Sequence, residues 1–138
     1  FPASQIVTHN DKHWIYYNGY QERHGIGDRG KHGIGLATLK LDRFIGLEAQ
    51  EDKWGTIVTK PFKLEGDKLQ VNVVGGEFLV EVLNQQGEPL PGFARPQAAG
   101  YKSVDDLRLV PTWKNSLSTL KGRAIRLRFH LRNSKLYS

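Results

Sequence analysis

Histidines and carboxylates gather near the start of this sequence, and imidazole together with carboxylate is a ligand set that suits transition metals. The group consists of His9, His13, His24, His32, Asp11 and Glu22. Its spacing matches no recognised zinc motif, because His9 and His13 flank an expected turn and are not one helical turn apart. We therefore predict no metal site.

A glycine-rich segment, 25–30, fits the G-x-G-x-x-G spacing of dinucleotide-binding loops. Such a loop binds phosphate because a helix begins there and directs free N–H groups at the anion. The residues after Gly30 alternate as a β-strand does, so this helix is missing. We interpret the segment as a flexible connection between antiparallel strands, and we predict no cofactor.

Aromatic residues form the next group that could bind a ligand. Trp14, Tyr16 and Tyr20 fall on one face of an expected strand, with Tyr17 on the other. Flat aromatic rings with polar tips stack on sugars or on bases. Aromatic residues also favour strands and bury large areas in a core or an interface, so packing remains the alternative.

A basic stripe runs along the segment 123–132. Arg126, Arg128, His130 and Arg132 alternate with apolar residues. With a formal net charge of +6, the stripe suits a polyanion. It is equally typical of the solvated outer face of a strand whose other face is buried.

Composition limits the remaining choices. A chain of 138 residues has room for one domain and a small appendage. It contains no cysteine, which excludes disulfides and cysteine-bound zinc, and no apolar run long enough for a membrane span. Because it begins with Phe1 and lacks methionine, we expect a fragment or a processed chain.

The elements that must position these residues are nearly all β-strands, since short alternating runs end at Gly, Pro, Asn or Asp. We expect strands over 5–9 and 13–19 around a turn at 10–12, and a further strand over 37–41. One hairpin face should be buried on residues after Phe44, because a hairpin alone is marginally stable in water.

The rest of the chain predicts a sandwich. Segments 55–64, 68–74 and 77–84 are expected to be three strands joined by tight turns, and 94–103 a longer loop. Segment 106–113 is predicted to be an edge or bulged strand because of Pro111, 116–120 a helical turn, and 123–132 the last strand. Alternation predicts that Glu81 points away from a core that consists of Val71, Val73, Phe78, Val80, Val82, Ile125, Leu127, Phe129 and Leu131.

Taken in order, these stretches resemble the C-terminal part of bacterial glycosyl-hydrolase-like proteins. The last blade of a five-bladed β-propeller, of the broad kind found in glycosidase families 32 and 43, is similar to WIYYNGY…HGIGLATLKLDRF. The β-sandwich appended to such propellers is similar to GTIVTKPF, LQVNVVGGEFLVEVLNQQGEPLPGF and LKGRAIRLRFHLRNSKLYS. The resemblance runs from about Trp14 to Ser138, and it stops where a little more strand is expected.

The resemblance implies an all-β chain with a propeller-like hairpin over 1–44, packed on an antiparallel, jelly-roll-like β-sandwich over 45–138. The catalytic acids of such proteins lie on earlier blades, so the isolated chain is expected to hydrolyse no glycoside. The implied partners are an oligo- or polysaccharide and either the missing propeller or another chain. The implied location of the protein is extracellular or periplasmic. The carbohydrate-binding candidates are Trp14, Tyr16, Tyr20, Glu22, Arg23 and His24.

Three functions remain open at this point. The first is a non-catalytic accessory sandwich, either structural or carbohydrate-binding. The second is a fragment that supplies substrate contacts to a propeller glycosidase. The third is a small basic module for nucleic acid or another polyanion, which needs Lys and Arg clustered around exposed aromatic residues. Interspersed acids such as Asp28, Asp42 and Glu48 argue against nucleic acid.

Overall fold

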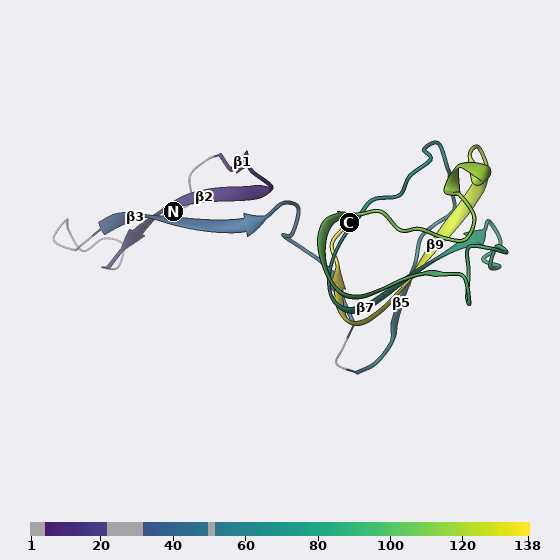
Figure 1. The fold of residues 1–138 in the computed structure, drawn as a ribbon. Helices are drawn as coiled ribbons and strands as arrows, with labels where there is room; N and C mark the ends of the chain where they lie inside the picture. The colour runs from purple at the N-terminus through teal and green to yellow at the C-terminus, as the bar shows by residue number, and fades with distance from the viewer. Residues whose placement is uncertain (1–4, 22–31, 50–51) are drawn as a thin grey trace. The chain divides into compact units, whose positions relative to one another are not determined.

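The computed structural model describes residues 5–21, 32–49 and 52–138 (Figure 1). Its regular structure is almost entirely antiparallel β-strand, as the sequence predicts. Contacts divide the chain into two compact units, Phe1–Phe44 and Ile45–Ser138, which we call unit 1 and unit 2. Packing of the hairpin on the sandwich stays a prediction.

Unit 1 forms a three-stranded antiparallel sheet in the described residues, in the order β1 (Val7–His9), β2 (Lys12–Tyr20) and β3 (His32–Lys40). Asn10 and Asp11 join β1 to β2 with positive φ angles of 49° and 56°. Asn and Asp accept this left-handed conformation, and a two-residue turn of this kind matches the twist of the strands that it joins. The predicted hairpin turn is therefore confirmed.

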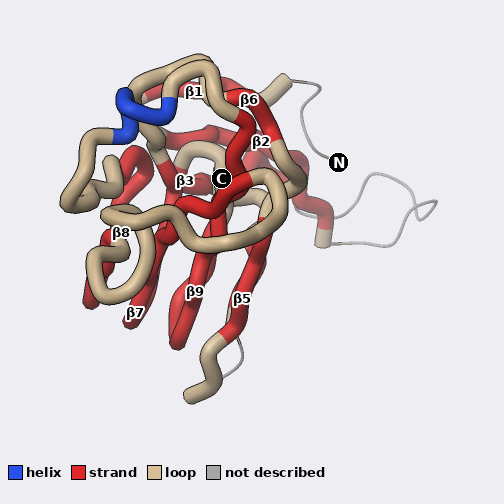
Figure 2. The backbone as a smooth tube through the Cα atoms, turned by 90° about the vertical axis from the view of Figure 1, so that its right-hand side faces the viewer, coloured by secondary structure: helices blue, strands red, loops and turns tan. Residues whose placement is uncertain are grey.

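Unit 2 is an antiparallel β-sandwich built largely from one bent sheet (Figures 1 and 2). Its elements are β4 (Leu47–Glu48), β5 (Gly55–Val58), β6 (Phe62–Lys63), β7 (Val71–Asn84), β8 (Ala99–Leu109), the 3-10 helix η1 (Leu117–Leu120) and β9 (Ala124–Leu136). β7 pairs with β8 on one side and with β9 on the other. The other side of β9 pairs with β6, β5 and β4, so β9 has more strand partners than any other described strand of the sheet.

A row of unusual backbone angles bends this sheet. Gly75 of β7 has a φ of 127° and faces Val104 of β8 and Ser134 of β9. The residues that precede these two partners, Ser103 and Asn133, also have positive φ, at 51° and 48°. A bend shared by three neighbouring strands folds the sheet at a corner, so that one sheet encloses a core from two sides.

The corner also changes which side chains face inward. Along β9, Ile125 and Leu131 are buried at odd positions, whereas Ser134 and Leu136 are buried at even positions beyond the bend. The same change occurs in β7, which is a single continuous strand of 14 residues. The expectation of two separate strands on either side of Gly75 is therefore wrong: the glycine bends the strand without ending it.

The predicted core is confirmed. All of its members are buried and belong to one cluster: Val71, Val73, Phe78, Val80, Val82, Ile125, Leu127, Phe129 and Leu131. At its centre, the rings of Phe78 and Phe129 stack with centroids 6.0 Å apart. The cluster draws further side chains from outside the predicted strands, including Phe93, Leu117 and Leu136.

The connections of unit 2 correct one prediction and confirm another. The predicted loop 94–103 gives way to β8 from Ala99 onward, because this segment pairs with Val80 and its neighbours on β7. The helical turn is present as η1. β8 lies at the edge of the sheet and ends before Pro111, which accords with the restriction that proline imposes on a paired strand.

Candidate functional site

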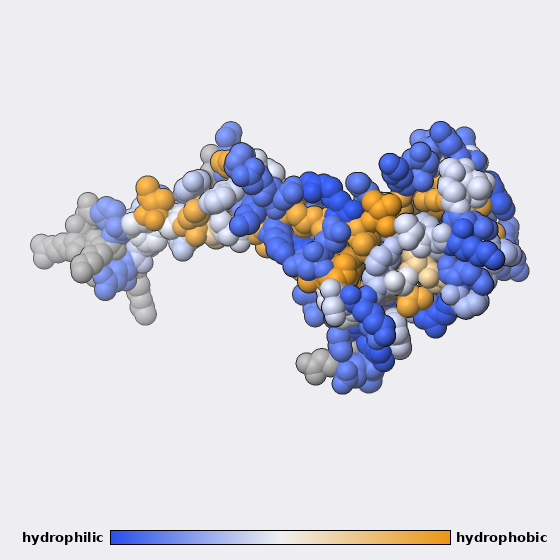
Figure 3. Space-filling model, viewed as in Figure 1, coloured by the Kyte–Doolittle hydropathy of each residue, from blue (hydrophilic) through white to orange (hydrophobic). Residues whose placement is uncertain are grey.

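The aromatic residues of unit 1 lie where alternation predicts. Tyr16 and Tyr20 share one face of β2, and their side chains are 45% and 60% exposed. On the same face, Leu36 pairs with Tyr16, and the highly exposed Ile34 pairs with Asn18. We call Tyr16, Tyr20, Ile34 and Leu36 the aromatic face. Figure 3 shows apolar side chains at the surface of unit 1.

Trp14 differs from the two tyrosines. It is half-buried, and its Nε1 donates a hydrogen bond to the carbonyl oxygen of His9 at 3.3 Å. This bond ties the indole to the first strand of the hairpin. Trp14 therefore supports the end of the aromatic face and offers less free surface than Tyr16 or Tyr20.

Tyr17 lies on the opposite face of the same strand, with 44% of its side chain exposed. Its ring covers Gly35, where an added Cβ would collide with the ring. Tyr17 thus has the exposure of Tyr16 but points the other way, which makes it a natural control for the aromatic face.

His13, one of the metal-ligand candidates considered above, is buried and already engaged. Its Nδ1 lies 2.9 Å from Thr8 Oγ1, and its Nε2 accepts the backbone N–H of Asp42 at 3.1 Å. The ring also packs on Phe44, with centroids 4.8 Å apart. His13 closes the end of the small sheet, and the described ranges contain no group of three or more potential metal ligands.

Three of the six carbohydrate-binding candidates, Glu22, Arg23 and His24, lie outside the described residues, as does the glycine motif 25–30. The structure thus brings Tyr16 and Tyr20 together on an exposed face, with Trp14 at its margin. No described helix is both long and apolar enough to cross a bilayer.

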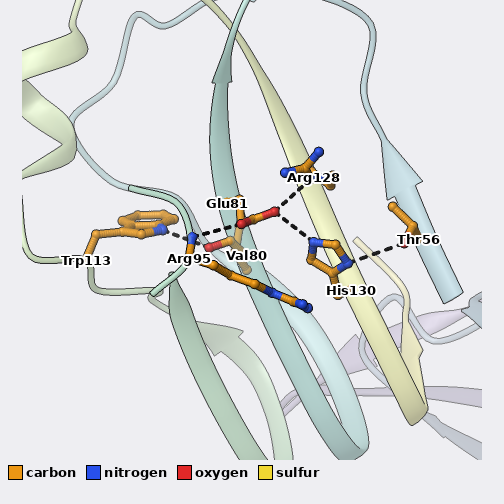
Figure 4. Close-up of polar contacts among 7 residues, drawn as sticks. All are labelled: Thr56, Val80, Glu81, Arg95, Trp113, Arg128 and His130. Atoms are coloured by element: carbon orange, nitrogen blue, oxygen red, sulfur yellow. Dashed lines mark hydrogen bonds and ion pairs between the residues drawn. The ribbon is translucent and has the colours of Figure 1, made fainter. Parts of the chain in front are cut away.

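A polar cluster on the outer face of β7 and β9 was not foreseen from the sequence. Glu81 is only 2% exposed, although it points away from the core. Its Oε2 accepts hydrogen bonds from Arg128 Nε at 2.7 Å and His130 Nε2 at 2.8 Å, and its Oε1 accepts the backbone N–H of Arg95 at 2.9 Å (Figure 4). His130 Nδ1 in turn lies 3.3 Å from Thr56 Oγ1 on β5. We call these residues the Glu81 cluster.

The hydrogen bonds decide the charge of Glu81. Burial alone raises the pKa of a carboxyl group, but the donors from His130, the Arg95 backbone and Arg128 outweigh burial. Together they lower the pKa of Glu81 from 4.5 to about 2. Because a carboxylate only accepts, His130 Nε2 must carry a hydrogen, and in the neutral ring Nδ1 accepts from the Thr56 hydroxyl.

The order carboxylate, imidazole, hydroxyl is also that of a hydrolase triad. Here, however, Arg128 binds the same carboxylate oxygen as His130 and already compensates its charge. The cluster joins β7, β9, β5 and the chain at Arg95, which are far apart in sequence. These hydrogen bonds hold the segments together on the outer face of the sheet.

The basic stripe on β9 is largely occupied. Arg132 pairs with Glu77 at 2.7 Å, just as Arg128 pairs with Glu81. Arg126 donates to the carbonyl oxygens of Gln85 and Thr59. Trp54 lies beside the stripe, with the guanidinium carbons of Arg132 and Arg95 at 5.1 and 5.8 Å from its ring centroid, within the range of cation–π attraction.

No protein-family model matches this sequence, and comparisons with curated proteins and with solved structures find no match.

Proposed function

We propose that this chain is a non-catalytic accessory part of a larger glycoside-hydrolase-like protein, and that the aromatic face of unit 1 binds carbohydrate. The observation that carries the proposal is the pair of exposed tyrosines, Tyr16 and Tyr20, on one face of a regular strand. Their Cα atoms are separated by about 13 Å along an extended strand, a span that fits an oligosaccharide of a few rings.

The chemistry of the face supports this ligand class. A tyrosine ring offers an apolar surface to the C–H groups of a sugar, and its hydroxyl offers a hydrogen bond to a neighbouring sugar hydroxyl. Asn18 lies between the two tyrosines on the same face and adds an amide. An open strand surface of this kind suits a chain that runs across it.

The buried acid of unit 2 is unsuited to the role of the general acid in glycoside hydrolysis. Glycoside hydrolysis needs a carboxylic acid that is still protonated near neutral pH, which requires a raised pKa. Glu81 is the one fully buried acid among the residues that the structure describes, and its pKa is lowered. Its bonds to Arg128 and His130 hold it in the charged form that cannot donate a proton.

The other candidate functions draw less support from the described residues. A polyanion needs free cations, whereas Arg128 and Arg132 of the basic stripe are paired with glutamates. A role in supplying substrate contacts to a propeller glycosidase would use the same aromatic face, and it becomes testable once the chain is joined to such a propeller.

Binding of soluble oligosaccharides to the full chain tests the proposal. In titration calorimetry with cello-, xylo-, malto- and fructo-oligosaccharides, we expect at least one series to bind. Tyr20→Ala and Tyr16→Ala should each weaken binding about two- to tenfold, because each removes one stacking surface.

Tyr17→Ala is the matched control, since it removes an equally exposed ring from the opposite face. It should leave the affinity unchanged. Equal losses for Tyr17→Ala and Tyr16→Ala, or no binding of any series, would contradict the proposed function.

A further inference from the structure

Unit 2 contains a small pocket that none of the functions considered so far uses. It has a volume of about 190 Å³ and lies between residues 67–69, which precede β7, and residues 110–117, which follow β8. We call it the end pocket. A single water needs about 10–15 Å³ of such volume, so the end pocket has room for several waters or for one small ring.

The lining of the end pocket is amphipathic and balanced in charge. It contains one acid and one base, Asp67 and Lys68, so the pocket carries no net charge from its side chains. An amide and two hydroxyls add further polar groups, from Asn115, Thr112 and Ser116, and Trp113 adds an aromatic ring. Apolar side chains, among them Leu69 and Val110, complete the wall. Donors and acceptors around an apolar surface are what a polyhydroxylated ring requires.

The wall is held in place by the core. Trp113 Nε1 donates to the carbonyl oxygen of Val80 at 2.9 Å, and its ring packs against Phe93 with centroids 6.1 Å apart. The Tyr101 hydroxyl accepts the backbone N–H of Thr112 at 3.0 Å and donates to the carbonyl oxygen of Val110 at 3.3 Å. A pocket fixed before the ligand arrives loses less entropy on binding.

Asn115 is fixed in the same way. Its Nδ2 donates to the carbonyl oxygen of Pro91 at 3.3 Å, and its backbone N–H donates to that of Gly92 at 3.4 Å. Gly92 has a φ of 83°, and a Cβ at this position would collide with the Asn115 amide. The glycine therefore allows the close approach that anchors this wall of the pocket.

We propose that the end pocket binds a single ring of a neutral sugar, at a site separate from the aromatic face. The inference rests on the proposed carbohydrate-binding function and extends it to unit 2. Neutrality of the ligand follows from the opposed charges of Asp67 and Lys68, although the chain as a whole is basic. The apolar wall would receive one face of the ring, and the polar rim would bind its hydroxyls.

Methyl glycosides of glucose, galactose, mannose and xylose test this site on the ¹⁵N-labelled full chain. We expect at least one of them to shift the indole N–H resonance of Trp113 saturably, with a dissociation constant of about 1 mM for so small a ligand. Asp67→Ala should weaken binding about tenfold or more, because it removes a charged hydrogen-bond acceptor. Val110→Phe should abolish the shift by filling the pocket.

Lys114→Ala is the matched control, because Lys114 belongs to the same loop but does not line the pocket. It should bind like the unaltered chain, and the amide spectra of all variants should show that the fold is kept. Three results would each overturn the inference: no saturable shift with any methyl glycoside, an undiminished shift in Val110→Phe, or tighter binding of glucuronate than of glucose.

The two proposed carbohydrate sites can be tested independently of each other. If Tyr20→Ala leaves the Trp113 shift unchanged while Val110→Phe abolishes it, the end pocket stands whether or not the aromatic face binds. If oligosaccharide binding depends on Tyr20 and methyl glycosides leave the Trp113 resonance unperturbed, the proposed function is supported and the proposal for the end pocket is contradicted.

Discussion

For Glu81, alternation along the strand predicts the direction of the side chain correctly but does not predict its burial. Alternation along β7 sends its side chain away from Phe78 and Val80, and a charged residue on an outer face is ordinarily solvated. In the folded chain it is buried and carries three hydrogen bonds. Its energetic weight therefore depends on neighbours that β9 and the chain at Arg95 supply.

We predict that Glu81 makes stability depend on pH in the acid range. Its folded pKa of about 2 lies below the ordinary value of 4.5, so its contribution is complete above about pH 4.5 and is lost as the pH falls towards 2. The shift corresponds to about 3 kcal/mol. Urea unfolding from pH 6 to pH 2 should show that the unaltered chain loses its advantage over Glu81→Gln across this window.

Glu77→Gln serves as the comparison, since Glu77 pairs with Arg132 but is more exposed. It should cost about 0–1 kcal/mol at pH 6, as a surface pair does. Parallel pH profiles for Glu81→Gln and the unaltered chain would show that the Glu81 cluster contributes no pH-dependent stability.

At the scale of elements, the corner of the large sheet decides the shape of unit 2. Gly75, Ser103 and Asn133 form a row across three strands, and the inward-facing positions change parity there. Without this bend, Val73 and Phe78 would point to opposite faces of one strand. With it, both enter the same core.

We predict that Gly75→Ala destabilises the chain more than Gly87→Ala does. Both glycines have positive φ, at 127° and 96°, so alanine is strained at either position, by about 1–3 kcal/mol. At Gly75 an added Cβ would also collide with the Asn133 carbonyl oxygen, whereas nothing lies near it at Gly87. Urea midpoints measure the difference, and equal costs would show that the corner tolerates a side chain.

The orientation of the β9 side chains leads to a second prediction about these elements. Phe129→Ala should lower the free energy of unfolding by about 3–5 kcal/mol, because it removes a buried ring that stacks on Phe78. Val58→Ala on the neighbouring strand β5 should cost far less, since Val58 is exposed. An unchanged denaturation midpoint for Phe129→Ala would mean that the inner face of β9 is assigned wrongly.

At the scale of the whole molecule, the two units differ in how much they bury. In the described part of unit 1, only His13 is buried, whereas unit 2 holds an extensive core. A region with few buried apolar contacts opens at a lower free energy than a packed one.

We therefore predict that backbone amides of β2 and β3 exchange with solvent faster than those of β7 and β9. Native-state hydrogen exchange read by NMR checks this strand by strand. Equal protection in both units would contradict it. That result would indicate one cooperative body, which is what the predicted packing of the hairpin on the sandwich requires.

The sequence by itself determined the fold class, the positions of most strands and the inward face of the core. Alternation with a period of two is a local property that any strand displays, so Phe129 and Leu131 could be placed in the core without knowing their partners. The same reasoning placed Tyr16 and Tyr20 on one face. The turn at Asn10 and Asp11 was equally readable, because their residue types favour its backbone angles.

Only the tertiary structure decided what covers each face. Thr56 and His130 are 74 positions apart, yet they are direct partners across β5 and β9. The walls of the end pocket, near Asp67 and Asn115, likewise come from separate loops. A local pattern reports the direction of a side chain, but its neighbours depend on long-range strand register. For that physical reason, the Glu81 cluster, the corner and the end pocket emerged only from the folded chain.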